Sequence, residues 1–366
     1  MHIHPFHAIL PQSHLIASVD SFFGTVKEDF KTYKEGGFFT RTQKPVLYVY
    51  RISRKDHVYT GIIAANSLED LDQDVILRHE KTLAAKEQHM LRLTLERRAQ
   101  IKPVLLGYPG KKKINQLMQT YLSKDPTFSF FFKETKEKHE LWEINLGSEI
   151  KKLQEYFLDI PKVYVADGHH RCATSLNLRQ SQLEGKYKMK FESLLVLYMS
   201  FDDLEIHDFN RIIDISNKVS HAQFMAKLSL VCKIKPLKSR EKPTKKHEMT
   251  CCIGGEWYRL RWKKSILLKN EASLKFDTAL VNQYILDDIL GIQDVRTNPR
   301  IEYKSGVNGL ASIDKTVQRN HDKVAICLYP ITAEDLMRVA QEHKTLPPKS
   351  TWFEPRVKNG MVGIEL

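Results

Sequence analysis

The chain has 366 residues, of which 42% are hydrophobic and 28% charged, and its formal net charge at pH 7 is +13. This length favours two domains over one core, and the composition excludes a disordered protein. The apolar runs are too short to cross a bilayer, and the first residues lack the basic-then-apolar pattern of a secretion signal. We therefore expect a soluble, cytoplasmic protein without a membrane partner.

The predicted elements follow from hydrophobic periodicity and from turn residues. In the first part of the chain they are a strand around 3–10, a helix at 21–33, a hairpin of strands 46–51 and 59–64, a helix at 86–102, a strand at 104–108, and helices at 114–122 and 148–156. Further on they are a strand at 163–166, a helix that begins at 169 or 170 and continues to 183, a strand at 191–199, a hairpin at 249–261, a helix at 278–290, a strand at 324–328 and a helix at 333–341. This mixture predicts an α+β (mixed α/β) protein with domains 1–215 and 216–366.

The positive charge is partly concentrated in the segment from Lys233 to His247, where two prolines interrupt a run of lysines. Nucleic acid, an acidic membrane surface and anionic small molecules such as nucleotides are all compatible partners for a basic protein. We interpret the segment as a solvated loop, because charge runs are usually solvated. Basicity alone does not establish DNA binding. The five cysteines are odd in number and lack a C-x-x-C spacing, so free thiols are the simplest interpretation.

The most informative stretch is Asp167-Gly168-His169-His170-Arg171, at the turn from a buried strand into a helix. The glycine permits a tight turn, and the amide groups at the start of a helix favour an anion, commonly phosphate. Arg171 adds a possible clamp on phosphate oxygens, and the two histidines donate hydrogen bonds or transfer protons. Asp167 is a candidate ligand of Mg²⁺ or a group that orients a histidine. The alternative is a surface turn whose aspartate caps the helix.

Two other segments contain candidate site residues. In Arg78-His79-Glu80-Lys81-Thr82, position 83 is leucine, so the second histidine of a zinc-protease motif is absent. Glu80 beside His79 is a candidate general base, although it also suits the start of a charged helix. In the proline-stiffened segment from Leu346 to Pro355, Lys349 is a candidate phosphate contact, while a simple turn with a packed tryptophan is equally compatible.

These segments resemble, along nearly the whole chain, the bacterial and archaeal family called domain of unknown function 1015. The matching segments are Pro5-Phe6, Tyr48-Val49-Tyr50-Arg51, His79-Glu80-Lys81-Thr82, Tyr164-Val165-Ala166-Asp167-Gly168-His169-His170-Arg171, Asn210-Arg211, Asp294-Val295-Arg296-Thr297 and Pro347-Pro348-Lys349-Ser350-Thr351-Trp352-Phe353. Where members often have Pro-Tyr-Asp, this chain has Ser18-Val19-Asp20, which puts the role of that loop in doubt.

The Asp-Gly-His-His-Arg turn also looks like the phosphate-contacting turn of the ParB/sulfiredoxin superfamily. There a Gly-x-His-Arg or Asp-Gly-His-Thr-Arg motif opens a helix beneath a nucleotide, and the ADP-dependent free serine kinase has the second form. This resemblance implies a ParB/sulfiredoxin-like N-terminal core, with ADP or ATP and Mg²⁺ as cofactors held by residues 167–171. It also implies a catalytic glutamate, for which Glu80 is the candidate. The reactive cysteine of sulfiredoxin corresponds to His169, so sulfinic acid repair is not expected.

The leading hypothesis is a Mg²⁺-dependent phosphotransferase for a small-molecule substrate, similar to a serine kinase, or a nucleotide hydrolase. In it Glu80, His79 and His170 are catalytic, and Asp167, Gly168, His169, His170, Arg171 and Lys349 bind phosphate. The alternative is a nucleotide-gated binding protein of the ParB type that associates with DNA and has no turnover; nucleic acid is not the favoured partner, because no helix-turn-helix is evident. A third hypothesis is a metal-dependent hydrolase, although consecutive histidines diverge at a helix start. The oligomeric state is left open.

Overall fold

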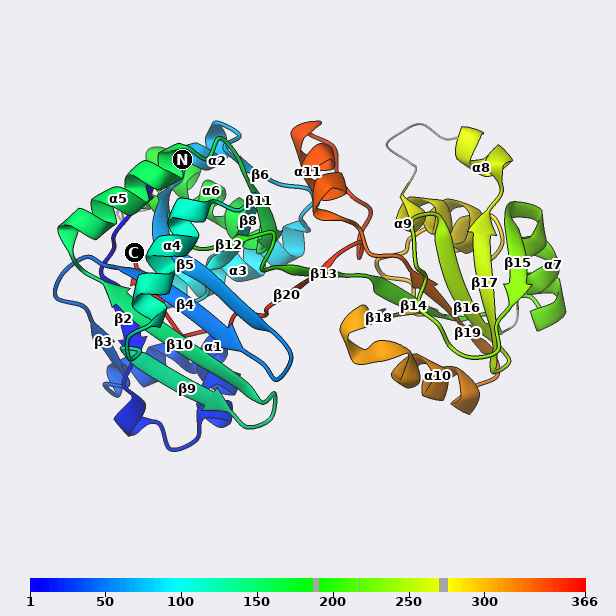
Figure 1. The fold of residues 1–366 in the computed structure, drawn as a ribbon, viewed down its shortest axis with the longest axis horizontal. Helices are drawn as coiled ribbons and strands as arrows, with labels where there is room; N and C mark the ends of the chain where they lie inside the picture. The colour runs from blue at the N-terminus through cyan, green and yellow to red at the C-terminus, as the bar shows by residue number, and fades with distance from the viewer. Residues whose placement is uncertain (187–190, 217, 270–275) are drawn as a thin grey trace. The chain divides into compact units, whose positions relative to one another are not determined.

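The computed structural model describes residues 1–186, 191–216, 218–269 and 276–366. They form two compact units, the first made of 1–205 with 355–366 and the second of 206–354 (Figure 1). The expected single division at residue 215 differs from this arrangement in two ways. The strand 209–214 pairs within the second unit, and the last twelve residues return to the first. Among the described residues, no helix has both the length and the apolar character that crossing a bilayer requires.

The first unit contains most of the elements. They are β1 (Ile3–His4), β2 (Ala8–Pro11), η1 (Ser13–Leu15), α1 (Val19–Glu35), β3 (Phe39–Arg41), β4 (Leu47–Ser53), β5 (Val58–Ser67), α2 (Glu69–Asp72), β6 (Ile76–Leu77), α3 (Ala84–Arg97), β7 (Ala99–Gln100), β8 (Val104–Tyr108), α4 (Lys112–Leu122), β9 (Phe128–Phe132), β10 (Glu137–Ile144), α5 (Gly147–Leu158), β11 (Val163–Asp167), α6 (His169–Leu183), β12 (Ser193–Ser200) and β21 (Gly363–Glu365). β13 (Glu205–His207) leads from the first unit into the second.

A nine-stranded sheet organises the first unit, in the order β6-β11-β8-β12-β5-β4-β10-β9, with β1 beside β5. The inner strands are apolar on both faces, as in Leu194-Leu195-Val196-Leu197 of β12, and these side chains are buried. Such strands need a cover on each face. α4 and α5 lie across one face (Figure 1), and α6 packs against β8 and α3. A smaller sheet, β3-β2-β21-β7, joins the chain's two ends.

The second unit is also mixed. Its elements are β14 (Phe209–Asp214), α7 (His221–Val231), β15 (Cys232–Pro236), β16 (Glu248–Ile253), β17 (Glu256–Trp262), α8 (Lys264–Lys269), α9 (Asp277–Leu280), η3 (Val281–Asp287), β18 (Ile301–Ser305), η4 (Gly306–Asn308), α10 (Gly309–Arg319), β19 (Lys323–Leu328), α11 (Ala333–Gln341) and β20 (Trp352–Glu354). Six strands form a sheet in the order β15-β17-β16-β19-β14-β18. Apolar clusters cover both of its faces. The expected mixture of helix and strand is confirmed.

Several predicted elements need correction. The strand expected at 3–10 is two strands in different sheets, with Pro5 between them. The helix expected at 86–102 ends at Arg97, because Arg98 adopts a left-handed backbone (φ 49°) and the chain enters β7. The helix expected at 278–290 is α9 followed by the π-helical turn η3. The basic segment from Lys233 to His247 is only partly a loop, because its first residues belong to β15.

Candidate functional site

Sheet topology brings the two main motifs of the sequence to one edge. β6 and β11 run parallel, with Ile76 opposite Val163, so the segments that follow them leave the sheet on the same side. One segment contains His79 and Glu80, and the other contains the turn at Gly168. β8 runs antiparallel to β11, so its start lies beside the end of β11, where Leu105 pairs with Asp167. Lys102, just before β8, therefore belongs to the same edge.

Gly168 makes the turn from β11 into α6 with φ of +116°, a backbone conformation that L side chains rarely adopt. The N-cap residue of α6, Gly168, has no side chain with which to cap the first amide groups of the helix. Arg171 folds back over the glycine, so closely that an added Cβ at position 168 would lie 2.6 Å from its Nη2 atom. The glycine is therefore required both by the backbone angle and by the guanidinium above it.

Three cationic groups surround the carboxylate of Asp167. Arg171 donates to Oδ2 at 2.8 Å, Arg356 donates to Oδ1 at 2.8 Å, and the Lys102 ammonium lies 3.8 Å from Oδ2. These four groups carry two more positive charges than negative ones, three cations against one carboxylate. The cations outweigh the effect of burial and lower the pKa of Asp167, whereas burial and the neighbouring arginines lower the pKa of Lys102 to about 8.

The two arginine partners of Asp167 bear on its expected role as a magnesium ligand. Both oxygens of Asp167 accept hydrogen bonds from guanidinium groups, and a metal ion would have to displace them and approach two arginines. The surroundings of Asp167 therefore do not fit a divalent cation, and they fit an anion instead. Its carboxylate holds Arg171 and Arg356 in place. The Nε atom of Arg171 is buried and has no hydrogen-bond partner among the described residues.

His169 links the two motifs. Its Nδ1 atom lies 3.5 Å from Oε2 of Glu80, and its ring packs edge-on against His79 with the centroids 4.5 Å apart. One potential ligand atom from each of these three residues lies within 4.8 Å of the other two. Burial lowers the pKa of His79 to about 3 and lowers that of His169 well below its usual value. Both imidazoles are therefore neutral near pH 7.

His170 turns away from His169, as expected for consecutive residues at a helix start. Its Nε2 atom accepts a hydrogen bond of 3.1 Å from the backbone N–H of Leu83, the residue that precedes α3. The proton of the neutral ring therefore resides on Nδ1. The contact ties the start of α6 to the start of α3. His170 thus positions the segment that contains Glu80, and its expected roles in catalysis and phosphate binding stay predictions.

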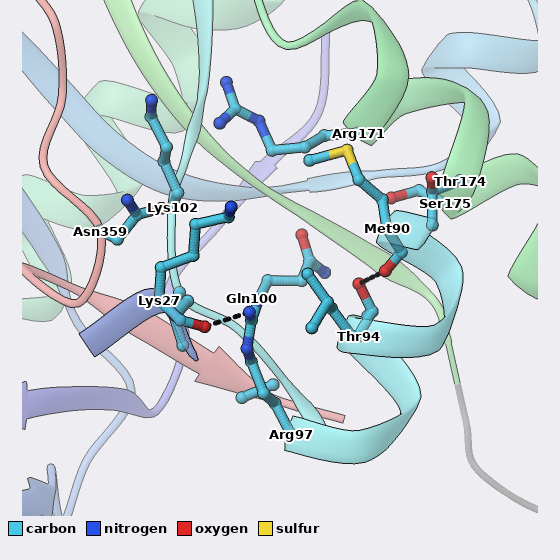
Figure 2. Close-up of a pocket in the computed structure, with 13 residues that line it drawn as sticks. Lys27, Met90, Thr94, Arg97, Gln100, Lys102, Arg171, Thr174, Ser175 and Asn359 are labelled. Atoms are coloured by element: carbon cyan, nitrogen blue, oxygen red, sulfur yellow. Dashed lines mark hydrogen bonds between the residues drawn. The ribbon is translucent and has the colours of Figure 1, made fainter. Parts of the chain in front are cut away.

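Arg171 also lines a pocket (Figure 2). Its space is about 570 Å³, including the part open to solvent. The side chains of Lys27, Lys102 and Arg171 come from α1, the segment before β8 and α6, and lie around the same hollow (Figure 2). The full lining is Lys27, Met90, Leu93, Thr94, Arg97, Ala99, Gln100, Ile101, Lys102, Arg171, Thr174, Ser175 and Asn359.

The structure thus brings Glu80, His79 and the 167–171 turn together in the first unit. Lys349 lies in the second unit, where its ammonium stands 5.0 Å from the ring centroid of Phe209 and its carbonyl accepts from Arg211. Its role as a phosphate contact stays a prediction. Sequence reasoning missed Lys102 and Arg356. The only signal for Lys102 was its place next to a predicted strand, and Arg356 follows the proline-rich segment without any motif of its own.

Comparison with solved structures finds distant likenesses. SbnI with a C-terminal truncation from Staphylococcus aureus matches with a TM-score of 0.44 and 11% identity over 81% of this chain and 85% of that one. A free serine kinase variant in complex with ADP matches with a TM-score of 0.39 and 12% identity, over 81% of this chain and 92% of that one. The free serine kinase in complex with AMP matches with a TM-score of 0.37 and 12% identity, over 81% of this chain and 91% of that one. At TM-scores below 0.5, these likenesses do not bear on activity.

No curated protein matches the chain. The family described as "Protein of unknown function (DUF1015)" matches residues 4–287, which is more than half of the chain. The match spans the segment of Glu80, the turn at Gly168 and the pocket residues of α1, α3 and α6. The chain therefore belongs to the DUF1015 family.

Proposed function

We propose that this protein binds a nucleotide through its phosphates and transfers the terminal phosphoryl group to a small molecule. The observation that carries the proposal is the excess of positive charge around Asp167, next to the start of α6, whose N-cap residue is a glycine, and beside a pocket. Guanidinium groups and helix-start amides are the usual partners of phosphate oxygens in proteins. The motif resemblance to the phosphate-contacting turn of the ParB/sulfiredoxin superfamily supports the same assignment.

In the proposed reaction, Arg171 and Lys102 bind the phosphate oxygens while Glu80 acts as general base. Glu80 takes the proton from the acceptor hydroxyl, the hydroxyl oxygen bonds to the terminal phosphorus, and the bond from phosphorus to the leaving nucleotide oxygen breaks. Charge neutralisation and positioning do most of the work in such transfers. A Mg²⁺ ion held by the nucleotide would neutralise further phosphate charge, and Asp167, which pairs with Arg171 and Arg356, would not be its ligand.

The direct test is calorimetric titration with ATP and ADP, each with and without Mg²⁺. Arg171→Gln removes a charge-assisted contact that is typically worth about 1.5–3 kcal/mol, so nucleotide affinity should fall about 10- to 100-fold. Arg179→Gln is the matched control, because Arg179 lies two turns later on α6 and pairs with Asp72. Equal affinities in the wild type and in Arg171→Gln would contradict the phosphate assignment.

Glu80 is tested separately. Glu80→Gln keeps the shape of the side chain and removes the base, so nucleotide should still bind while transfer to an acceptor stops. A variant that loses binding and turnover together would contradict the assignment of Glu80 as base.

A metal-dependent hydrolase is the second candidate, favoured by the group of His79, Glu80 and His169. Two neutral imidazoles and a carboxylate suit zinc or another transition metal better than Mg²⁺. Titration of metal-free protein with Zn²⁺ tests it. Stoichiometric binding that His169→Gln abolishes would favour the hydrolase, and its absence would remove this candidate.

A further inference from the structure

The pocket beside Arg171 is positively charged and contains no counter-charge of its own. Four of its lining residues are basic, namely Lys27, Arg97, Lys102 and Arg171, and among the described residues that line it none is acidic. Arg97 donates to the carbonyl of Lys27, and Lys27 pairs with Glu28 outside the lining. Arg171 and Lys102 share the single carboxylate of Asp167. A concave site with this charge attracts an anion.

Two residues with hydroxyl side chains, Thr174 and Ser175, also line the pocket. Arg171, Thr174 and Ser175 lie on one face of α6, at the spacing of neighbouring side chains on a helix. Thr174 is only 3% exposed, and its Oγ1 atom has no hydrogen-bond partner among the described residues. A buried hydroxyl in this state is uncommon, because most buried polar atoms are paired. A ligand that enters the pocket would supply the partner.

The remaining wall combines aliphatic side chains with the polar side chains of Thr94, Gln100 and Asn359. Met90, Leu93, Ala99 and Ile101 line the pocket, and none of its described lining residues is aromatic. A nucleobase usually stacks on an aromatic ring, so the lining fits an aliphatic body better than a base.

From these three properties we infer that the pocket binds a small aliphatic hydroxy acid, whose carboxylate contacts Lys102, Arg171 and Thr174 and whose body packs on Met90 and Ile101. In the proposed function the same two side chains bind the phosphate oxygens, so they would contact both anions and bring the hydroxyl of such an acid toward the transferred group. The role of the acid as phosphoryl acceptor rests on the proposed function. The binding of the acid to the pocket does not depend on that function.

Ligand-observed NMR tests binding without nucleotide, using glycerate, 3-hydroxybutyrate and malate as probes against the corresponding amides at equal ionic strength. We expect at least one acid to bind and its amide to bind about tenfold more weakly, because the amide has no charge. Acids and amides that bind equally, or no acid that binds, would overturn the inference. Inorganic phosphate is the competing probe, and binding of phosphate while none of the acids binds would also overturn the inference.

Thr174→Val identifies the site of binding. The variant keeps the shape of the side chain and removes a hydroxyl without a protein partner, so the fold should be as stable as the wild type or more so. Acid affinity should fall about tenfold, whereas ATP affinity should not change. Lys31→Gln, an exposed position one turn from Lys27 on α1 that does not line the pocket, serves as the charge control. Unchanged acid affinity in Thr174→Val would contradict the pocket assignment.

The two proposals fail in different ways. If acids bind in a Thr174-dependent manner and ATP does not bind at all, the proposed phosphotransfer is wrong and the acid site stands. If ATP binds in an Arg171-dependent manner and no acid binds, the acid site is wrong and the phosphate site stands.

Discussion

At the scale of single residues, the site depends on one glycine and the cations above it. Gly168 has a backbone angle that other residues adopt only at a cost, and the guanidinium of Arg171 occupies the space of a side chain there. Asp167 holds that guanidinium with one oxygen and Arg356 with the other. The positions of Asp167, Gly168, Arg171 and Arg356 therefore constrain one another in this turn.

Gly168→Ala should destabilise the protein by about 1–3 kcal/mol, the usual cost of a residue held in a sparsely populated conformation. It should also weaken nucleotide binding, because Arg171 must move. Gly185→Ala is the control, since Gly185 also has positive φ (+74°) but an added Cβ there meets nothing within 4 Å. Urea denaturation of both variants measures the difference. Equal destabilisation of the two variants would show that the contact with Arg171 adds nothing to the cost of the positive backbone angle.

Lys102 should make anion binding sensitive to pH. Its pKa in the folded protein is about 8, because burial and the nearby Arg171 and Arg356 disfavour the charged form, although Asp167 favours it. In the unfolded chain a lysine titrates near 10.4. Between these values the unfolded state binds more protons, so folding stability should rise as pH increases from about 8 to about 10.4.

Over the same range Lys102 loses its charge, so affinity for ATP should fall above about pH 8. Lys102→Met should remove both the stability increase and this decline in affinity. Denaturation curves and calorimetry from pH 7 to 10 measure the two effects. If stability and ATP affinity changed with pH in the same way in the wild type and in Lys102→Met, the assignment of this pH dependence to Lys102 would be contradicted.

At the scale of elements, the site forms where three strands end or begin. The parallel pair β6 and β11 releases Glu80 and Gly168 on one side of the sheet, and β8 begins there after Lys102. Local sequence patterns predicted β8, β11 and the start of α6 well, because each is a short apolar run with a clear turn residue. They did not predict β6, which has only two residues. Its pairing with β11 is a long-range contact that no local pattern contains.

His170 connects two of these elements, so its removal should loosen the segment before α3. In His170→Ala the N–H of Leu83 loses its acceptor, at a cost of about 1 kcal/mol. Hydrogen exchange should become faster at the Leu83 amide and unchanged in β12. Acid should have a similar effect in the wild type. Burial lowers the pKa of His170, so stability should decrease as pH falls below about 6.5 and the ring becomes protonated. Unchanged exchange at Leu83 would show that the contact is not formed in solution.

At the scale of the whole molecule, the mixture of helix and strand could be predicted from the sequence, but the path of the chain between the units could not. The sequence pattern predicts no helix or strand between residues 123 and 147, although this segment forms β9 and β10. Their phenylalanine-rich and charged residues match no simple alternation. The return of residues 355–366 to the first unit depends on contacts with residues hundreds of positions away, such as Ile364 with Ala8. Consequently the site residue Arg356 could not be assigned from sequence.

The C-terminal strand provides a test of the two-unit organisation. β21 lies between β2 and β7, so deletion of residues 362–366 removes one of the two partners of β2 and the partner of β7, while Arg356 remains. The loss of this strand should destabilise the first unit alone, because the second unit forms its own six-stranded sheet and core. Hydrogen exchange followed by mass spectrometry should show faster exchange in β2 and β7 and unchanged exchange in β16 and β19. A similar acceleration in both sets of strands would mean that the two units unfold as one cooperative body, and the division at residues 205 and 355 would then describe geometry without independent stability.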